Sequence, residues 1–249
     1  MPIVRILLVL LALASPALAQ DGARNASAAR DAAQAFRGYL EGVAKKGGRP
    51  EPTRPEVAAL FDRVFDLKAL NALPPVQAND ISWLMDWMDA ANTAHKLLML
   101  YGSKPGNEPD LAAIQTNMSQ YEDQYAVMMN FMIRGHARQA VSMKLFMASL
   151  APEQRTRIRE EGYTKARGSQ AEFILSVICA GIQASTRPDN ARLVAAAIRD
   201  TREVWANFFL PKDRTRIIQL LGDLSRQVPD EKARTDIVAF TAALRAVKI

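Results

Sequence analysis

The segment DISWLMDWMDAANTAHKLLMLYG, residues 80–102, decides the fold class of this chain. Its apolar side chains recur at steps of three and four, which is the spacing of a helix and not of a strand. Two apolar rows and one polar row predict a helix that is packed on two sides, as in the middle of a bundle. The first apolar row comprises Ile81, Leu84, Met88, Ala91, His95 and Leu98, the second comprises Trp83, Trp87, Ala90, Ala94, Leu97 and Tyr101, and the polar row comprises Ser82, Asp86, Asp89, Thr93 and Lys96.

Helical periodicity continues on both sides of this segment, and strand-like alternation is nearly absent. We predict helices over residues 25–46 and 54–70, and a helix from Leu111 that Gly135 kinks or ends. Because a first helical turn tolerates proline, later helices are expected to begin at Pro152, Pro188, Pro211 and Pro229. The predicted fold class is all-α, a multi-helix bundle of about seven to nine helices with short loops.

Residues 1–19 have the features of a cleavable secretory signal peptide. Arg5 precedes a short apolar run, and the small residues Ala17 and Ala19 suit a signal peptidase, so we expect cleavage between Ala19 and Gln20. The apolar run is shorter than the roughly 20 residues that a membrane-spanning helix needs. The sequence therefore predicts a periplasmic or secreted, soluble protein with no membrane span after cleavage.

The rest of the chain is predicted to have two parts. Residues 20–52 form an N-terminal helix followed by a Gly/Pro linker, KKGGRPEP, which we expect to attach that helix loosely; residues 53–249 form an all-helical domain. The single cysteine, Cys179, excludes a disulfide within one chain. Its apolar surroundings, FILSVICAGI, predict that Cys179 is buried as a small hydrophobic residue.

The net charge of +6 is spread unevenly along the chain. Residues 51–133 hold 11 acids and 5 bases, whereas residues 134–169 hold 8 bases and 3 acids. One interpretation is a basic face that binds anionic envelope polymer or acidic or unfolded envelope proteins. The other is that the basic segment packs beside the acidic one with most charges solvated. Nucleic acid is not expected as a partner of an exported protein. The candidate basic face comprises Arg155, Arg157, Arg159, Lys165 and Arg167.

Motifs of common enzymes are missing, so we expect a protein that is not an enzyme. The chain has two histidines, His95 and His136, and lacks the nucleophile elbow, the HExxH zinc motif and the phosphate-binding loop. The enzymatic alternative combines His95 with the carboxylates of Asp86, Asp89 and Glu122, which have the chemistry of general acids and bases. The simpler interpretation is a solvated acidic face beside a core histidine.

A methionine-rich segment supplies a further alternative. MMNFMIRGHARQAVSMKLFM, residues 128–147, places Met132, His136, Met143 and Met147 on one helical face. Thioethers and an imidazole are soft ligands suited to Cu(I), which is the cofactor that this alternative implies. Methionine is also an adaptable core filler, and under that interpretation the protein needs no cofactor.

Two short phrases, LPPVQ at residues 73–77 and LAPEQ at residues 150–154, have leucine first and glutamine fifth. They resemble the L-T-x-x-Q phrase that occurs twice in the LTxxQ family of periplasmic stress chaperones, the Spy and CpxP type, with Pro74 and Ala151 in place of threonine. The resemblance covers these two phrases alone. It implies an all-helical, ATP-independent periplasmic protein that shields unfolded clients or senses envelope stress, and that forms a cradle-like homodimer. Each phrase is equally a good helix start on physical grounds. We predict an exported, non-enzymatic binding or chaperone-like protein.

Overall fold

The computed structural model describes the backbone of residues 3–101, 110–183 and 185–247, and the side chains within these ranges from residue 20 onward. All regular elements in these ranges are helical and none is a strand, so the predicted all-α class is confirmed. The helix count slightly exceeds the prediction, because the sequence does not separate short helices, such as Leu67–Ala72 and Arg202–Phe208, from their neighbours. The α-helices are α1 (Ile3–Lys45), α2 (Pro55–Val64), α3 (Leu67–Ala72), α4 (Ile81–Met99), α5 (Leu111–Gln120), α6 (Glu122–Ser149), α7 (Arg157–Ile178), α8 (Pro188–Asp200), α9 (Arg202–Phe208), α10 (Pro211–Gln227) and α11 (Glu231–Ala246). The 3-10 turns η1 (Ala78–Asp80) and η2 (Pro152–Gln154) and the π-helical turn η3 (Cys179–Gln183) lie between them.

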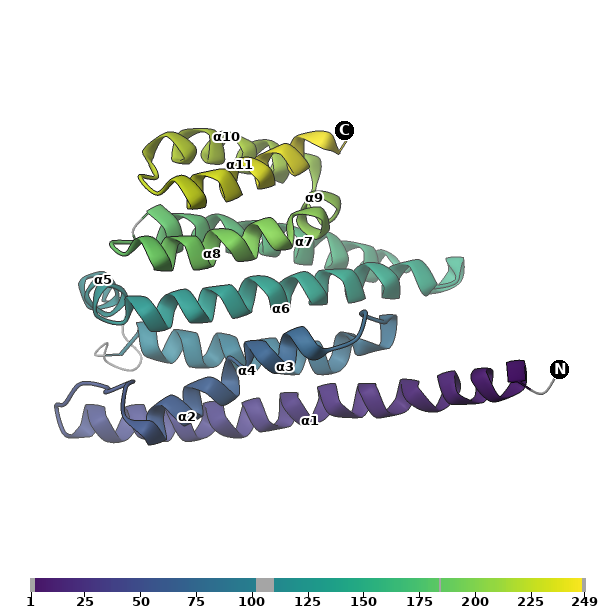
Figure 1. Ribbon diagram of the computed structural model, residues 1–249, viewed down its shortest axis with the longest axis horizontal. Helices are drawn as coiled ribbons and strands as arrows, with labels where there is room; N and C mark the ends of the chain where they lie inside the picture. Colours follow the sequence, from purple (N-terminus) through teal and green to yellow (C-terminus); the bar gives the residue numbers. More distant parts are fainter. Residues whose placement is uncertain (1–2, 102–109, 184, 248–249) are drawn as a thin grey trace.

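The long helices are stacked side by side (Figure 1). Helix α1 packs on α4, α4 packs on α6, α6 packs on α8, and α8 packs on α11. Helix α2 lies against α1, and α10 lies against α11. Because α6 is the middle member of this series, it carries contacts to both halves of the bundle and fixes where its own C-terminal end projects.

Helix α4 is packed on two sides, as its apolar rows predict. It lies between α1 and α6. The buried polar atom of Trp87 is satisfied, because its Nε1 donates to the carbonyl oxygen of Val64 at 3.0 Å. The buried side chains of α4 are Met99 and seven that come from both predicted apolar rows, Leu84, Trp87, Met88, Ala90, Ala91, Ala94 and Leu98.

Helix α1 shares one hydrophobic core with the rest of the described chain. Its inward face is formed by small residues and two large ones, and this lets α1 approach α4 closely. The segment that follows α1 is also held: the hydroxyl of Tyr39 accepts from the N–H of Glu51 at 2.8 Å, and Tyr121 donates to the carbonyl oxygen of Pro50 at 3.0 Å. The inward face of α1 comprises Ala26, Ala29, Ala32, Ala33, Phe36 and Leu40.

The expectation that Gly135 kinks or ends its helix is wrong. Helix α6 runs without interruption through Gly135, which is buried. A Cβ atom at this position would lie 2.3 Å from the Sδ atom of Met88 on α4. The glycine therefore lets the Met88 side chain of α4 pack directly against the backbone of α6, and it does not change the direction of the helix.

The helix predicted from Leu111 breaks at Tyr121, between α5 and α6. The reason is that α5 turns back to cap α4: the Nδ2 atom of Asn117 donates to the carbonyl oxygens of Met99 at 3.1 Å and of Tyr101 at 2.7 Å. These carbonyls belong to the last turn of α4 and the residues after it, which have no partner within the helix.

The proline positions predict later helix starts with mixed success. Pro188 and Pro211 are the first residues of α8 and α10. Pro152 opens only the short turn η2, and α7 begins at Arg157. Pro229 precedes Asp230, whose side chain caps α11.

The predicted signal peptide, residues 1–19, and its cleavage site lie outside the side chains that the structure describes. In the part of the chain that is described, none of the helices has the length and apolar character required to cross a membrane.

Candidate functional site

A helical hairpin projects from the bundle at the junction of α6 and α7 (Figure 1). We call residues 144–165 the arm; it comprises the C-terminal end of α6, the turn η2 and the N-terminal turns of α7. Every residue from 152 to 162 is exposed, so this part of the arm has no packing partner in the described chain. The arm contains the phrase LAPEQ and four of the five residues of the predicted basic face.

The turn of the arm is built by its own polar groups. Leu150 ends α6 in an extended conformation and Pro152 begins η2. The Oε1 atom of Gln154 accepts from the N–H of Ala151 at 3.2 Å, and the hydroxyl of Thr156, the N-cap of α7, accepts from the N–H of Arg159 at 3.4 Å. The chain therefore reverses direction through residues 152–156, which are all exposed, after the partly buried Leu150 and Ala151.

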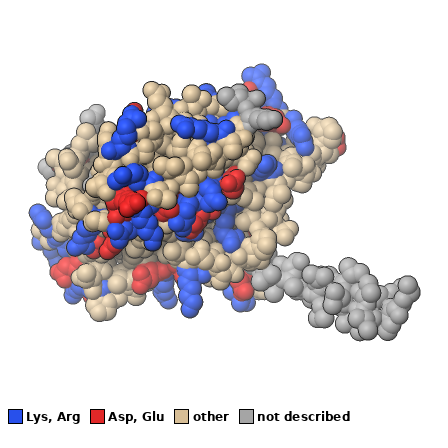
Figure 2. All heavy atoms as spheres, turned by 45° about the horizontal axis from the view of Figure 1, so that its top comes forward, with Lys and Arg blue, Asp and Glu red and all other residues tan. Residues whose placement is uncertain are grey.

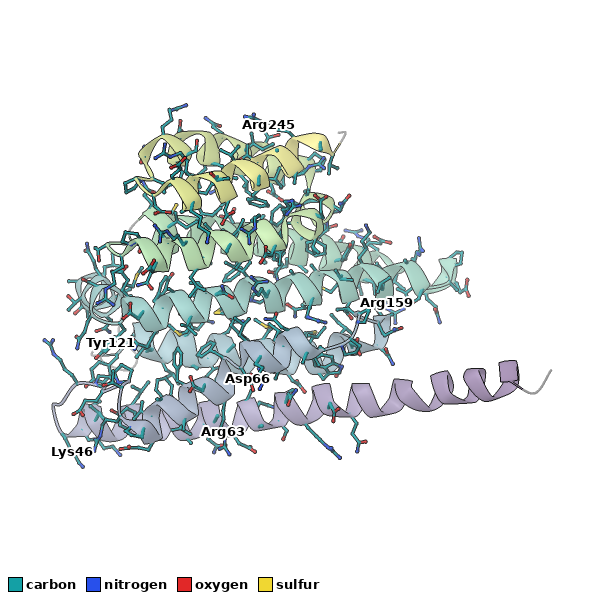
Figure 3. All side chains as sticks on the ribbon, in the orientation of Figure 1. Lys46, Arg63, Asp66, Tyr121, Arg159 and Arg245 are labelled. Atoms are coloured by element: carbon teal, nitrogen blue, oxygen red, sulfur yellow. The ribbon has the colours of Figure 1, made fainter. Side chains whose placement is uncertain are left out.

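The basic residues of the arm have different roles. Arg155 donates from Nε to the carbonyl oxygen of Leu150 at 3.2 Å, and Arg159, which is labelled in Figure 3, donates from Nη1 to the carbonyl oxygen of Gln154 at 2.6 Å. Both hydrogen bonds help to hold the turn. Arg157 pairs with Glu161 at 2.6 Å on the exposed surface, and Lys165 is exposed.

Arg167 does not belong to an outward basic face, which corrects the prediction for this residue. Its guanidinium lies against the rings of Tyr163 and Phe208, with its central carbon 5.6 Å and 6.0 Å from the ring centroids. It donates from Nη2 to the carbonyl oxygen of Phe209 at 3.0 Å and from Nε to that of Phe208. Arg167 therefore caps the C-terminal end of α9 and is a structural residue.

Exposed apolar side chains accompany the arginines. Ile158 is 82% exposed, Leu145 is 41% exposed and Phe146 is 37% exposed. Helical periodicity does not single out these three residues. One signal is present in the sequence: Ile158 interrupts a run of basic and polar residues, and no apolar residue lies three or four positions from it. The arm therefore combines positive charge with apolar surface on one projecting element.

The phrase LPPVQ lies at the base of the arm. Arg138 of α6 donates to the carbonyl oxygens of Leu73 at 2.8 Å and of Pro74 at 2.9 Å, and Ser142 donates to that of Gln77 at 2.8 Å. The two phrases differ in structure, because Gln77 precedes its 3-10 turn whereas the glutamine of LAPEQ ends its turn.

The methionine face of α6 does not bring its four candidate ligands to one point. Met132 and Met147 are 15 positions apart on one helix, which corresponds to about 22 Å of rise. Met132 is buried in the core, and the Nδ1 atom of His136 contacts Oε1 of Gln139 at 3.0 Å. One ion is within reach of at most a neighbouring pair, such as Met143 and Met147.

Burial sets the ionisation of both histidines. It lowers the pKa of His136 to about 4, against the opposing hydrogen bond with Gln139. Burial also lowers the pKa of His95 to about 4, and the charge of Lys96 adds to that effect. The ring of His95 packs on Tyr125, with the ring centroids 5.8 Å apart. Both imidazoles are therefore neutral near pH 7.

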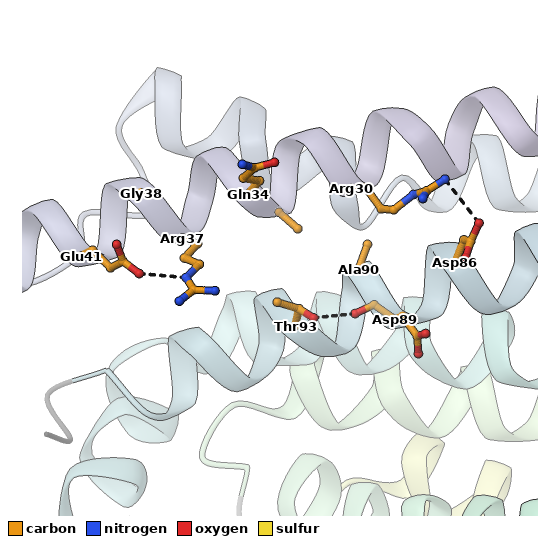
Figure 4. A pocket seen from close by; sticks show the side chains of 10 residues that line it. Arg30, Gln34, Arg37, Gly38, Glu41, Asp86, Asp89, Ala90 and Thr93 are labelled. Atoms are coloured by element: carbon orange, nitrogen blue, oxygen red, sulfur yellow. Dashed lines mark hydrogen bonds and ion pairs between the residues drawn. The ribbon is translucent and has the colours of Figure 1, made fainter. Parts of the chain in front are cut away.

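The carboxylates proposed to act with His95 do not converge. Asp86 pairs with Arg30 at 3.3 Å beside an open groove of about 690 Å³ between α1 and α4, which Asp89 also lines (Figure 4). Glu122 instead receives hydrogen bonds around the start of α8, including those of the Ser185 hydroxyl and the backbone N–H of Arg187. Burial acts to raise the pKa of Glu122, but these hydrogen bonds outweigh it and lower the pKa. Glu122 therefore holds the segment that precedes α8 and is a structural residue.

Cys179 is exposed, contrary to the prediction. It begins η3 and lines a groove of about 470 Å³ between α7 and α10, together with Leu175 and Leu220. Helix α7 turns Cys179 away from the core because its buried face is carried by Ile174 and Ile178.

The face shown in Figure 2 carries Lys and Arg side chains interspersed with Asp and Glu side chains. Among the side chains described, no group of three or more His, Cys, Asp and Glu residues is placed to hold a metal ion.

Comparison of the chain with protein-family models, with curated proteins and with solved structures gave no match in any of the three.

Proposed function

We propose that this chain is an exported, non-enzymatic binding protein with a chaperone-like role, and that the arm is its contact surface for unfolded or acidic envelope proteins. The observation that carries the proposal is the arm itself. It presents Ile158, Leu145 and Phe146 to solvent beside arginines, on a hairpin whose turn is held by hydrogen bonds.

The packing of α7 supports this role. The C-terminal half of α7 is anchored in the core through Ile174 and Ile178, whereas its N-terminal turns are exposed on all sides. An isolated short helix is marginally stable in water, so the anchored half keeps the exposed half helical. The result is a preformed apolar and cationic surface, which lowers the entropy cost of binding a flexible chain.

The test is suppression of client aggregation. An acidic protein unfolded by reduction of its disulfides is followed by light scattering, with and without the mature chain. We expect the wild type to lower the scattering and the variant I158S to lower it much less. The matched control is V238S, which removes a 55% exposed apolar residue on α11.

The outcomes distinguish binding at the arm from non-specific binding to any exposed apolar residue. Equal loss of suppression in I158S and V238S would assign the effect to exposed apolar surface in general. No suppression by the wild type would overturn the proposed function.

A further inference from the structure

The first turn of α7 has an unusual charge arrangement. Three arginines, Arg155, Arg157 and Arg159, lie at or just before the helix start, and Glu160 is the acidic residue of the first turn. The N-terminal end of a helix carries partial positive charge, so cations there are unfavourable and anions are favourable. A local rule broken in this way is typical of a site that serves binding instead of stability.

The guanidinium groups keep donors that the hydrogen bonds of the turn do not use. Arg155 uses Nε and Nη2 for carbonyl oxygens of its own turn, Arg159 uses Nη1, and Arg157 uses Nε for Glu161. In the described part of the chain, no hydrogen bond engages Nη1 of Arg155 or either Nη atom of Arg157. Because the turn bonds fix two of the three side chains, their remaining donors are held in place for a planar anion such as a carboxylate.

Ile158 lies between these arginines in the sequence and is the most exposed apolar side chain of the arm. An exposed apolar side chain flanked by hydrogen-bond donors gains most when a partner covers it and excludes water. The same partner that covers Ile158 places its neighbouring residues beside the guanidinium groups.

We propose that the arm selects polypeptide segments in which an apolar residue is flanked by carboxylates, with Ile158 as the apolar anchor and Arg155, Arg157 and Arg159 as the carboxylate contacts. The proposal rests on the proposed function, because it names the partner chemistry of the same surface. Charge complementarity favours an acidic segment as the partner of the arm. Its carboxylates would relieve the repulsion between the arginines and the positive end of the helix, whereas a cationic segment would increase that repulsion.

The experiment measures fluorescence anisotropy of three labelled peptides with the full mature chain. The first peptide has leucine and phenylalanine flanked by glutamates, the second has lysines in place of the glutamates, and the third keeps the glutamates but has serines in place of the apolar residues. We expect the first peptide to bind at least about tenfold more tightly than either of the others.

Two pairs of variants assign the binding to the arm. I158S is expected to weaken binding of the first peptide about tenfold, and R157Q is expected to weaken it severalfold and to reduce its salt dependence. The controls are V238S and R226Q, since Arg226 is likewise an exposed arginine paired with an acid on its own helix. Both controls are expected to bind as the wild type does.

The proposal is overturned if the lysine peptide binds as tightly as the glutamate peptide, or if I158S and R157Q bind like the controls. It is also overturned if vesicles of anionic phospholipid bind the arm while the peptides do not. Suppression of aggregation without this peptide preference would leave the proposed function standing and reject the selectivity. Selective peptide binding without suppression of aggregation would support the selectivity and reject the proposed function.

Discussion

The guanidinium of Arg155 donates from Nη2 to the carbonyl oxygen of Ala148 at 3.3 Å, which joins the residue after η2 to the last turn of α6. The terminal carbonyls of a helix have no partner within the helix, so this contact closes the end of α6 as well as shaping the turn. Arg155 and Arg157 are therefore expected to differ when they are removed, although both are exposed arginines of the arm.

Replacement of Arg155 by alanine should loosen the turn, because it removes donors to both Ala148 and Leu150. Limited proteolysis at neutral pH should cut R155A within residues 148–160 faster than it cuts the wild type. R157A loses only an exposed ion pair, which contributes well under 1 kcal/mol, and should be cut at the wild-type rate. Equal cleavage of R155A and R157A would mean that the turn does not depend on Arg155.

Replacement of Arg167 by methionine should lower the stability of the whole bundle. The carbonyl oxygens of Phe208 and Phe209 lose their donor, and an unmet buried acceptor costs about 1–3 kcal/mol. Thermal denaturation should show a melting temperature lower by several degrees. K165M, on the exposed side of the same helix, is the control and should melt like the wild type. A wild-type melting temperature for R167M would mean that Arg167 does not stabilise the bundle, and Arg167 would again be a candidate for the outward basic face.

The close approach at Gly135 predicts opposite effects for two glycine substitutions. G135A places a methyl group against Met88 and should destabilise the protein by about 1–3 kcal/mol, because a packed core must shift to admit it. G222A lies within α10 with nothing near the added methyl group, and it should stabilise the protein by about 0.5–1 kcal/mol. Chemical denaturation measures both free energies. A neutral G135A would show that α4 and α6 have room to separate.

The buried histidines predict that stability falls in mild acid. The folded state holds the pKa of His95 and of His136 at about 4, whereas the unfolded chain has the ordinary value of 6.5. The unfolded chain therefore binds more protons between these values, so their stabilising effect is complete above pH 6.5 and is lost as the pH falls toward 4. A shift of this size corresponds to about 3 kcal/mol for each group once the effect is complete.

Denaturant unfolding at pH 7.5 and pH 5 tests this prediction. The wild type should be less stable at pH 5, and H95Q and H136Q should each show a smaller difference between the two pH values. A stability that does not change over this range would mean that the imidazoles reach water in the folded state.

Periodicity in the sequence was sufficient for the fold class, because the two apolar rows of residues 80–102 require partners on both sides and α4 has them. The position of single residues depended on contacts between helices that periodicity does not encode. The sequence predicts a helix break at Gly135, because periodicity does not reveal that Met88 of another helix packs against this glycine. Arg167 was placed on the surface because its carbonyl partners follow some forty residues later in the chain.

The candidate site was only partly predictable for the same reason. The basic run at residues 155–159 is visible in the sequence, but its projection from the bundle follows from where α6 ends relative to α8 and α11 (Figure 1). The exposure of Ile158 follows from that projection, since the same residue in a packed turn would be buried. The apolar neighbours of Cys179 predict burial, but Cys179 is exposed because Ile174 and Ile178 form the buried face of α7.

The central claim is that partners bind to the arm, and amide hydrogen exchange of the mature chain with and without an unfolded acidic client tests it most directly. Because the N-terminal turns of α7 are exposed on all sides, their amides should exchange readily in the free protein. The account predicts that the client slows exchange over residues 144–165 and leaves α11 unchanged. Protection confined to the groove between α1 and α4, with no change in the arm, would contradict it.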